Sequence, residues 1–570
     1  MTHYSISYTN PLTHLVTIEI LIKNINSSSL EFQLPAWRPG RYELQNYAAN
    51  IKNFSVADQN GKRLSFAKTS RNKWKIEPNN SNIITLTYDY YAHQMDAGGC
   101  WLDEEQLYLN FICCLLYLPE KITDPCFVKL DLPSNYKIAC GLPQENQLLA
   151  AENFYHLVDS PMIASPTLTY FSFDCENIPF HLWIQGNNPL SPEKIIADFK
   201  KFTELQIAMM ENFPEKEYHY LFQFLPYPHY HGVEHRNSTV ITLGSSENLA
   251  EKRYEDLIGI SSHELFHTWN IVKIRPKELW PYDFTKENYF PTGFVAEGFT
   301  TYYGDLFLVR SGVISVEEYF TELNTTFKKH FNHFGNQNLS LVESSLDLWV
   351  DGYVAGIPDR KVSIYVKGCV AALILDLEIR LKTNHLKSLD DLMRLLWNRF
   401  GKKKIGYSLE DISIAAEEVT GIPLNDFFEE CIFGHTDMKE RLSNLVKDVA
   451  CILQEIPAPT TSERCFGLQI LAKENRYYVE SIAPNSPASY SFSKGDELLQ
   501  LNGSNIQGNF DEALYIRTQN NFTLKRFGRI VQISILGEEN GNYFPQHQLV
   551  FNENSDEKKI GHFKKWLHLI

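Results

Sequence analysis

The segment from His263 to His267 carries the residue types of a metallohydrolase site. It reads His-Glu-Leu-Phe-His, so that two histidines are four residues apart and Glu264 follows the first of them. On an α-helix, positions i and i+4 lie on one face, one turn apart. Both imidazoles can therefore bind one Zn²⁺, and Glu264 can act as general base toward the attacking water. We expect one zinc ion per chain here.

A catalytic zinc takes three protein ligands, so that the two histidines need a third. Glu297 begins an apolar and aromatic run that is typical of a helix, Glu297–Val309. A carboxylate there would complete a set of two histidines and one glutamate. No further histidine follows the motif at the spacing of a three-histidine site. A His-Glu-x-x-His motif also arises by chance, but the downstream glutamate favours a metal site.

Two further segments carry candidate substrate residues. Gly232-Val233-Glu234-His235 is predicted to be a loop before a strand. If it flanks the metal, Gly232 and Glu234 would bind substrate, with the Glu234 carboxylate pairing with a free α-ammonium and fixing which end of a peptide enters. A surface glutamate in a turn fits the pattern equally well. Tyr365 begins a predicted helix, where it is either a common aromatic at a helix start or a donor to an oxyanion.

Composition bounds the class of protein. The chain has 570 residues, of which 44% are hydrophobic and 13% aromatic, as in folded proteins of several domains. Its formal net charge of −16 argues against nonspecific nucleic-acid binding, which needs basic patches. The longest apolar runs are too short to cross a bilayer, so that we expect no membrane partner. No signal peptide is recognised, and the ten cysteines form no Cys-x-x-Cys pair. We therefore expect a cytoplasmic protein.

The elements that must position these residues indicate a multidomain α+β chain. Residues 1–170 are predicted to form a β-sandwich-like domain, because short alternating strands are separated by turn signals. Within it, the turn from Trp37 to Tyr42 is interpreted as packed, with Trp37 as a core or interface aromatic and a direct substrate role as the alternative. Residues 171–450 are predicted to form a mainly helical domain beside a mixed sheet, which is typical of thermolysin-like catalytic domains. A proline-rich linker then leads to a β-rich unit at 460–550 and a C-terminal tail at 551–570.

Taken in order, these motifs resemble the glycyl aminopeptidase family, peptidase family sixty-one, of the gluzincin type. The matching residues are the Trp37–Tyr42 turn, Gly232 to His235, His263 to Asn270, Glu297 to Tyr303, and Tyr365 to Gly368. The resemblance implies a zinc aminopeptidase with His263, His267 and Glu297 as ligands and Glu264 as base. It also implies that Glu234 binds the free amine, that Tyr365 donates to the oxyanion, and that small N-terminal residues such as glycine or alanine are preferred.

One residue departs from the family pattern. His231 stands where the family often has glycine, so that its imidazole is expected to narrow the entrance or to change the preference. Residues Phe466 to Gly503 resemble a PDZ domain, in which the loop at Gly467 and Leu468 would bind the C-terminal carboxylate of a peptide partner. Two alternatives remain open: a zinc endopeptidase guided by this domain, and a non-catalytic PDZ scaffold. An intact Glu264 argues against the scaffold, because a structural zinc site needs no base.

Overall fold

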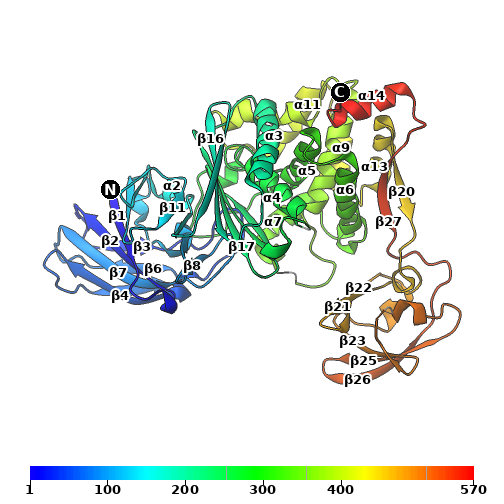
Figure 1. Cartoon of the computed structure of the whole chain (residues 1–570), viewed down its shortest axis with the longest axis horizontal. Coiled ribbons are helices and arrows are strands. Elements are labelled where there is room, and N and C mark those ends of the chain that lie inside the picture. The colour runs from blue at the N-terminus through cyan, green and yellow to red at the C-terminus, as the bar shows by residue number, and fades with distance from the viewer. Residues whose placement is uncertain (252, 355, 509, 570) are drawn as a thin grey trace. The chain divides into compact units, whose positions relative to one another are not determined.

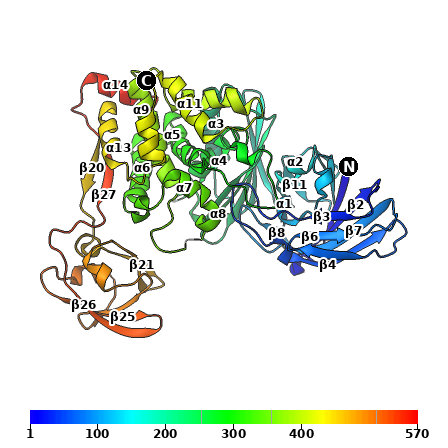
Figure 2. The same cartoon turned by 180° about the vertical axis from the view of Figure 1, so that it is seen from behind.

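The structure is a computed structural model that describes residues 1–251, 253–354, 356–508 and 510–569. Figures 1 and 2 show it from two opposite sides. The chain divides into two compact units. Unit 1 comprises Met1–Ser315, Leu341–Ala355 and Ser363–Phe428, and unit 2 comprises Val316–Ser340, Gly356–Val362 and Glu429–Ile570. All the candidate zinc and substrate residues belong to unit 1, whereas Gly467 and Leu468 belong to unit 2.

The N-terminal part of unit 1 is rich in β-structure, as predicted. Its strands are β1 (Thr2–Ser7), β2 (Leu15–Lys23), β3 (Leu30–Gln33), β4 (Ile51–Asp58), β5 (Phe66–Ser70), β6 (Lys73–Ile76), β7 (Ile83–Tyr91), β8 (Cys100–Leu102), β9 (Leu107–Leu109), β10 (Cys126–Leu130), β11 (Lys137–Cys140), β12 (Gln144–Glu145), β13 (Leu148–Ala151) and β14 (Met162–Ser165). They form sheets of seven, four and three strands, the largest in the order β12-β13-β10-β1-β2-β7-β4. Alternate residues of β2 and β7 are buried, because successive side chains of a strand point to opposite faces. Helices α1 (Phe111–Cys114) and α2 (Phe154–Val158) are short.

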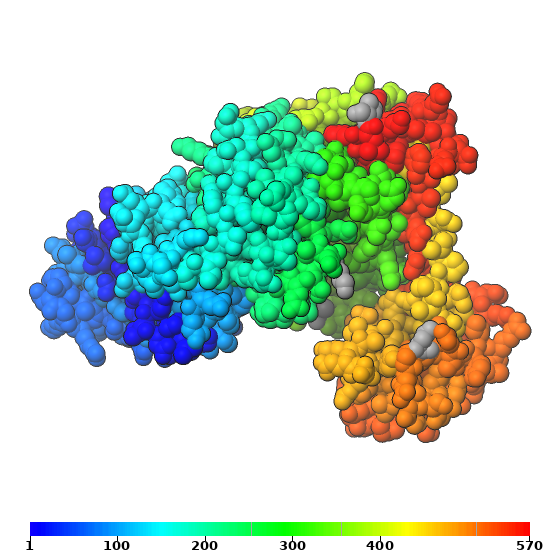
Figure 3. Space-filling view, viewed as in Figure 1, coloured from blue at the N-terminus to red at the C-terminus, as the bar shows by residue number. Residues whose placement is uncertain are grey.

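The β-rich part shares a hydrophobic core with later segments of unit 1. Trp37 is fully buried and donates its indole N–H to the carbonyl of Asp283 at 2.7 Å. Its ring meets those of Tyr282 and Trp349 edge to face, at centroid distances of 5.6 and 5.3 Å. This is the core aromatic that the sequence predicts. In the space-filling view, the β-rich residues and the segment that follows them form one continuous surface (Figure 3).

A mixed five-stranded sheet begins the next part of unit 1. Its strands are β15 (Thr169–Cys175), β16 (Ile178–Gly186), β17 (Tyr218–Leu225), β18 (His229–Glu234) and β19 (Ser238–Gly244), in the order β15-β16-β17-β19-β18. Helix α3 (Pro192–Met210) connects β16 to β17, which run parallel. The Ser191 side chain caps it by accepting a hydrogen bond from the Lys194 N–H. Strand β17 is buried along its whole length, as expected for the centre of a covered sheet.

The predicted loop at residues 232–235 is wrong for its first three residues. Gly232, Val233 and Glu234 lie in β18, which pairs antiparallel with β19 at the edge of the sheet. Two histidines and a glycine weaken the strand pattern of this segment, so that the pairing with β19, rather than local propensity, decides its conformation.

Helices make up the rest of unit 1. They are α4 (Tyr254–Phe266), a π-helical turn (Phe294–Phe299), α5 (Thr300–Arg310), α7 (Leu341–Leu346), α8 (Leu348–Asp351), α9 (Val366–Lys382), α10 (Leu389–Leu396), a second π-helical turn (Trp397–Gly401), α11 (Leu409–Thr420) and α12 (Asn425–Phe427). Helix α4 packs against α5, and α5 packs against α9 (Figure 1). These three helices carry the zinc motif, the chain that follows Glu297, and the chain that follows Tyr365.

Unit 2 combines helices with two sheets. Helix α6 (Val316–Phe331) packs against β27 (Gln546–Phe551), which pairs antiparallel with β20 (Cys451–Ile456), and the unit also contains α13 (Lys439–Leu445) and α14 (Glu557–Trp566). Its second sheet comprises β21 (Leu468–Lys473), β22 (Arg476–Ile482), β23 (Glu497–Leu501), β24 (Ser504–Asn505), β25 (Asn520–Arg526) and β26 (Arg529–Ile535), around a separate hydrophobic core.

Across the described residues of both units, no helix combines the length and the apolar character that crossing a membrane requires.

Candidate metal centre

Helix α4 brings the two histidines of the motif together. The Nε2 atoms of His263 and His267 are 3.0 Å apart, and their ring planes stand at 84° to each other. Rings in this arrangement direct two nitrogen lone pairs toward a common point. His267 is almost fully buried, whereas the His263 side chain keeps 17% of its exposure.

Glu297 lies opposite these histidines on the π-helical turn. Its Oε2 is 3.7 Å from His263 Nε2 and 3.3 Å from His267 Nε2. Tetrahedral ligands about 2.1 Å from a zinc ion are roughly 3.4 Å from one another. The three ligand atoms therefore have the chemical type and the mutual spacing that Zn²⁺ requires. The extra residue of a π-helical turn is frequent at functional sites.

A hydrogen bond to Nδ1 of His267 fixes which of its two ring nitrogens faces Glu297 and His263. His267 Nδ1 is 2.8 Å from the carbonyl of Asn270, which can only accept, so that Nδ1 carries a proton and Nε2 is the nitrogen left to bind a metal. The Asn270 side chain in turn donates to the carbonyl of Val295 and to Thr300 Oγ1. Burial lowers the pKa of His267, but the carboxylate of Glu297 outweighs it and raises that pKa to about 10. A metal ion would therefore displace a proton.

Two glycines let the helices of the site approach each other. A Cβ atom on Gly298 would lie 2.5 Å from the backbone of Gly368, which follows Tyr365 by one turn. Such a contact excludes any side chain at Gly298 without moving the backbone. The residue next to Glu297 thereby brings the start of α9, and Tyr365 with it, close to the ligand. The sequence gives no signal for this pairing beyond the glycines themselves.

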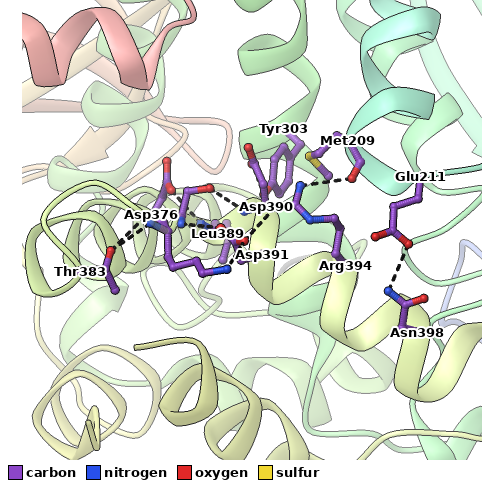
Figure 4. Close-up of polar contacts among 12 residues, drawn as sticks. Met209, Glu211, Tyr303, Asp376, Thr383, Leu389, Asp390, Asp391, Arg394 and Asn398 are labelled. Atoms are coloured by element: carbon purple, nitrogen blue, oxygen red, sulfur yellow. Dashed lines mark hydrogen bonds and ion pairs between the residues drawn. The ribbon is translucent and has the colours of Figure 1, made fainter. Parts of the chain in front are cut away.

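A buried polar cluster anchors α5 behind the site. Tyr303 donates to Asp390 Oδ1 at 2.9 Å, and Arg310 contacts both oxygens of Asp390 at 3.0–3.1 Å. The backbone N–H of Leu389 donates to Asp376 at 2.9 Å, which joins α9 to α10 (Figure 4). Burial raises the pKa of Asp390, but Arg310 outweighs it and lowers that pKa to about 2. The carboxylate thus stays ionised and holds the helix that follows Glu297.

Glu264 is buried in the same site. A Cβ atom on Gly232 would lie 2.3 Å from Glu264 Oε1, so that β18 passes directly over the carboxylate and needs glycine there. Glu264 Oε2 has no hydrogen-bond partner among the described residues. Burial raises the pKa of Glu264 well above its ordinary value, although the nearby His267 opposes the rise. A carboxylate with one unoccupied oxygen in such surroundings is suited to accept a proton.

Glu234 joins this group from β18. Carboxylate oxygens of Glu234 and Glu264 lie within 4.8 Å of each other and of a His267 ring nitrogen. Burial raises the pKa of Glu234, while His267 opposes that effect. Two buried carboxylates at this separation repel each other, and a cation between them would relieve the repulsion.

The β-rich part of unit 1 contributes Gly40 of the Trp37–Tyr42 turn to this site. Gly40 has a left-handed φ of 74°, and a Cβ atom there would lie 2.6 Å from Glu234 Oε2. The turn that contains Trp37 is therefore packed, as predicted, but it also contacts a candidate substrate residue. A Pro-Gly pair indicates a turn in the sequence; only the fold places that turn against Glu234.

Tyr365 precedes α9 as its N-cap residue and is partly buried. Burial raises the pKa of its phenol well above the ordinary value, and the negative charges of Glu297 and Glu234 add to the effect. The phenol therefore keeps its proton and can act as a hydrogen-bond donor near both carboxylates.

The expectation that His231 narrows the entrance is not supported by its contacts. His231 Nδ1 accepts a hydrogen bond from the Ala97 N–H of the β-rich part at 3.3 Å. It precedes Gly232 in β18, and neighbouring residues of a strand point to opposite faces. Because Gly232 faces Glu264, the His231 imidazole is directed toward the β-rich part.

Gly467 and Leu468 lie in unit 2, at the start of β21. Gly467 has a left-handed φ of 68°. Its N–H donates to the carbonyl of Ser462, and its carbonyl accepts from the Ala483 N–H at 2.9 Å. Leu468 is buried in the core of the second sheet.

The chain is similar to known proteins in sequence and in fold. Residues 3–166 match the peptidase M61 N-terminal domain, and residues 256–371 match the M61 glycyl aminopeptidase domain. No curated protein matches the sequence. A crystal structure of an aminopeptidase N family protein from Idiomarina loihiensis superposes with a TM-score of 0.92 at 25% identity, covering 100% of both chains.

More distant solved structures also align. A variant of an M1 zinc metallopeptidase from Deinococcus radiodurans, bound to a Tyr-Ser-Ala substrate, has a TM-score of 0.48 at 13% identity and covers 76% of this chain and 94% of its own. Native yeast LTA4 hydrolase has a TM-score of 0.44 at 12% identity and covers 79% of this chain and 70% of its own.

Proposed function

Because the chain belongs to the M61 glycyl aminopeptidase family, we propose that it is a zinc-dependent aminopeptidase of the gluzincin type. It hydrolyses the first peptide bond of peptides that have a free N-terminus. His263, His267 and Glu297 hold one zinc ion per chain, which their mutual spacing supports. When bound, zinc supplies Lewis acidity toward the scissile carbonyl and the attacking water.

The observation that carries this proposal is the position of Glu234. Its buried carboxylate lies within 4.8 Å of the general-base candidate Glu264 and of a ring nitrogen of His267. A substrate ammonium at the Glu234 carboxylate would be paired and removed from water at the same time. Its attachment at Glu234 fixes the distance from the N-terminus to the cleaved bond, so that only the first bond reaches the base.

The remaining steps are assigned to two side chains. Glu264 takes the proton of the attacking water and passes it to the leaving amine; its carboxylate oxygen without a hydrogen-bond partner among the described residues supports this role. The protonated phenol of Tyr365 donates a hydrogen bond to the oxygen that becomes negative in the transition state.

We assign a preference for small first residues such as glycine or alanine. The turn at Gly40 lies against Glu234, and the neighbouring Tyr42 is fully buried and donates its backbone N–H to Tyr353 Oη at 3.1 Å. Backbone and aromatic groups thus crowd the side of Glu234 that faces the β-rich part.

Residues 460–550 are proposed to be a PDZ-like domain, which follows the β-rich domain at 1–170 and the catalytic domain at 171–450 and precedes the tail at 551–570. A peptide C-terminus would bind there at Gly467 and Leu468, in exchange for the contact between Gly467 and Ser462. Binding of a fluorescent peptide that is lost in Gly467→Pro would support this partner. The ten cysteines are buried free thiols, which supports a reducing compartment such as the cytoplasm.

The aminopeptidase is tested with one peptide in free and N-acetylated forms. Glu234→Gln should lower kcat/KM for the free peptide by about 30-fold or more, the range for one truncated partner of a buried charge pair. The wild type should cleave the acetylated form poorly. Glu255→Gln, on the exposed face of α4, is the matched control and should change neither value.

Comparable wild-type rates on the free and acetylated peptides would instead favour the endopeptidase. Absence of hydrolysis by zinc-loaded protein on a panel of aminoacyl amides would favour the scaffold.

A further inference from the structure

Unit 1 contains a cavity that the proposed function does not use. Its volume is about 340 Å³, at the lower end of the range for small-molecule sites. Residues of the β-rich part, among them Tyr155 and Asp159, form one wall, and residues of the chain on either side of the zinc helix form the other, among them His235 and Arg275. Both walls belong to the same compact unit.

The cavity is rich in positive charge, although the whole chain carries −16. Two of its cations are paired: Arg236 contacts Glu152 and Glu215 at 3.1 Å each, and Lys273 also contacts Glu215. Arg275 and Lys404 have no carboxylate within 4 Å in the described part of the chain. Arg38 also lines the cavity; it donates to the carbonyl of Pro39 and likewise has no carboxylate within 4 Å among the described residues. Three cationic groups thus remain for an anionic ligand.

Arg275 is held in place by aromatic rings. Its guanidinium carbon lies 4.1 Å from the ring centre of Tyr282 and 4.7 Å from that of Trp280. The Nε and Nη2 groups donate to the carbonyls of Ile271 and Val272. Among the described residues, Nη1 has no acceptor. A planar guanidinium oriented in this way is well suited to bind a carboxylate.

A buried imidazole in the cavity also lacks a partner. His235 is 6% exposed, and its Nδ1 lies 3.0 Å from Asp159 Oδ1. Its Nε2 has no hydrogen-bond partner among the described residues. This nitrogen is therefore available for a hydrogen bond with a polar occupant of the cavity.

We propose that this cavity binds an aromatic carboxylate. Its carboxylate would contact Arg275 and Lys404, and its ring would pack on Tyr155, Trp280 and Phe284, which line the same space. The shared chemistry has two sources, a free aromatic acid or the C-terminus of a peptide that ends in an aromatic residue. The cavity adjoins the amine position through His235, but Glu234 is not among its lining residues.

Calorimetry on the zinc-loaded full-length protein tests the proposal, with benzoate as the probe. Benzoate should bind with one site per chain, and benzamide and acetate should bind at least tenfold more weakly, because each lacks one half of the recognised chemistry. N-acetylglycylphenylalanine represents the peptide source: tighter binding than benzoate assigns the site to peptide C-termini, and weaker binding assigns it to free aromatic acids.

Variants locate the bound anion. Arg275→Gln should weaken benzoate binding about tenfold or more, and Lys404→Gln should weaken it severalfold. Lys403→Gln is the matched control, because Lys403 is the exposed neighbour that does not line the cavity. If Arg275→Gln lowers the folding yield, the comparison of Lys404→Gln with Lys403→Gln still tests the proposal.

Three results would overturn the proposal. They are the absence of binding at millimolar benzoate, equal affinity for benzamide, and benzoate binding that chelator abolishes while Lys404→Gln leaves it unchanged. The last result would assign the anion to the metal centre.

Discussion

Among the described residues of unit 1, two clusters each combine two histidines with one glutamate, and their ring geometry differs. The cluster outside the candidate metal centre has three ligand atoms within 4.8 Å of one another. They belong to His181 of β16, to His219 of β17 and to Glu217, which directly precedes β17. In that second cluster the two imidazoles are neighbours across parallel strands and stack at 26°, with ring centres 4.5 Å apart. Stacked rings direct their lone pairs side by side, whereas the rings of His263 and His267 stand at 84°.

Hydrogen bonds to the outer nitrogens separate the clusters further. The indole N–H of Trp183 donates to His219 Nδ1 at 3.2 Å, so that the proton of a neutral His219 lies on Nε2 and faces Glu217. In the metal centre a carbonyl faces His267 Nδ1, which leaves the lone pair on Nε2. Both clusters have the same types of ligand. The hydrogen-bond partner of each Nδ1 atom therefore decides whether the Nε2 atom of that histidine presents a lone pair or a proton to the glutamate.

The largest expected effect is on zinc content. His263→Ala should remove both the metal and the peptidase activity, because two ligands remain. His219→Ala should leave one zinc ion per chain and nearly full activity. Elemental analysis together with hydrolysis of an aminoacyl amide measures both. Zinc lost from His219→Ala, or retained in His263→Ala, would reverse the assignment of the two clusters.

The next effect compares Glu264, the proposed general base, with Glu217 of the second cluster. Glu264→Gln should keep zinc and lower kcat by about 10²–10⁴-fold, since an amide cannot take the proton of the attacking water. Glu217→Gln, in the other cluster, should leave kcat unchanged. Single-turnover rates at saturating substrate measure the chemical step. A Glu264→Gln enzyme with the wild-type rate would rule out this residue as the base.

A smaller effect tests the groups behind the ligands. Asn270→Ala removes the side-chain contacts to Val295 and Thr300 that hold the carbonyl facing His267. Zinc affinity should fall by roughly 10–100-fold. Trp183→Phe deletes only the indole donor of the other cluster and should leave that affinity unchanged. Competition with a fluorescent chelator gives both constants, and equal affinities for the two variants would contradict the comparison.

The smallest effect concerns pH. Burial, with His219 beside it, lowers the pKa of His181 below its ordinary value, although Glu217 opposes this. Below about pH 6.5 the unfolded chain therefore binds more protons at this ring than the folded protein does. The contribution of His181 to the free energy of unfolding is fully present above that pH and is lost as the pH falls below it. His181→Gln should flatten the dependence of Tm on pH between 5 and 7, by about 1–2 °C. An unchanged slope would mean that this ring is not the group that titrates.

The sequence was sufficient where local spacing and periodicity carry the information. An i, i+4 pair of histidines on a helix faces one point by backbone geometry alone, and the alternation in β2 and β7 is read directly from residue order. It predicted the β-rich beginning and the helix that starts at Tyr365. It was wrong about Gly232 to Glu234, because an edge strand is defined by its partner strand.

The sequence by itself determined which side chains are available for zinc chemistry, since helix periodicity places His263, Glu264 and His267 within one turn of one another. Only the tertiary structure decided what surrounds them: Gly40 against Glu234, Gly298 against Gly368, and a carbonyl rather than an indole N–H behind the histidine. Each of these contacts joins residues whose separation in the chain bears no relation to their distance in space. They follow from the packing of sheets and helices around a common core, which no local pattern encodes.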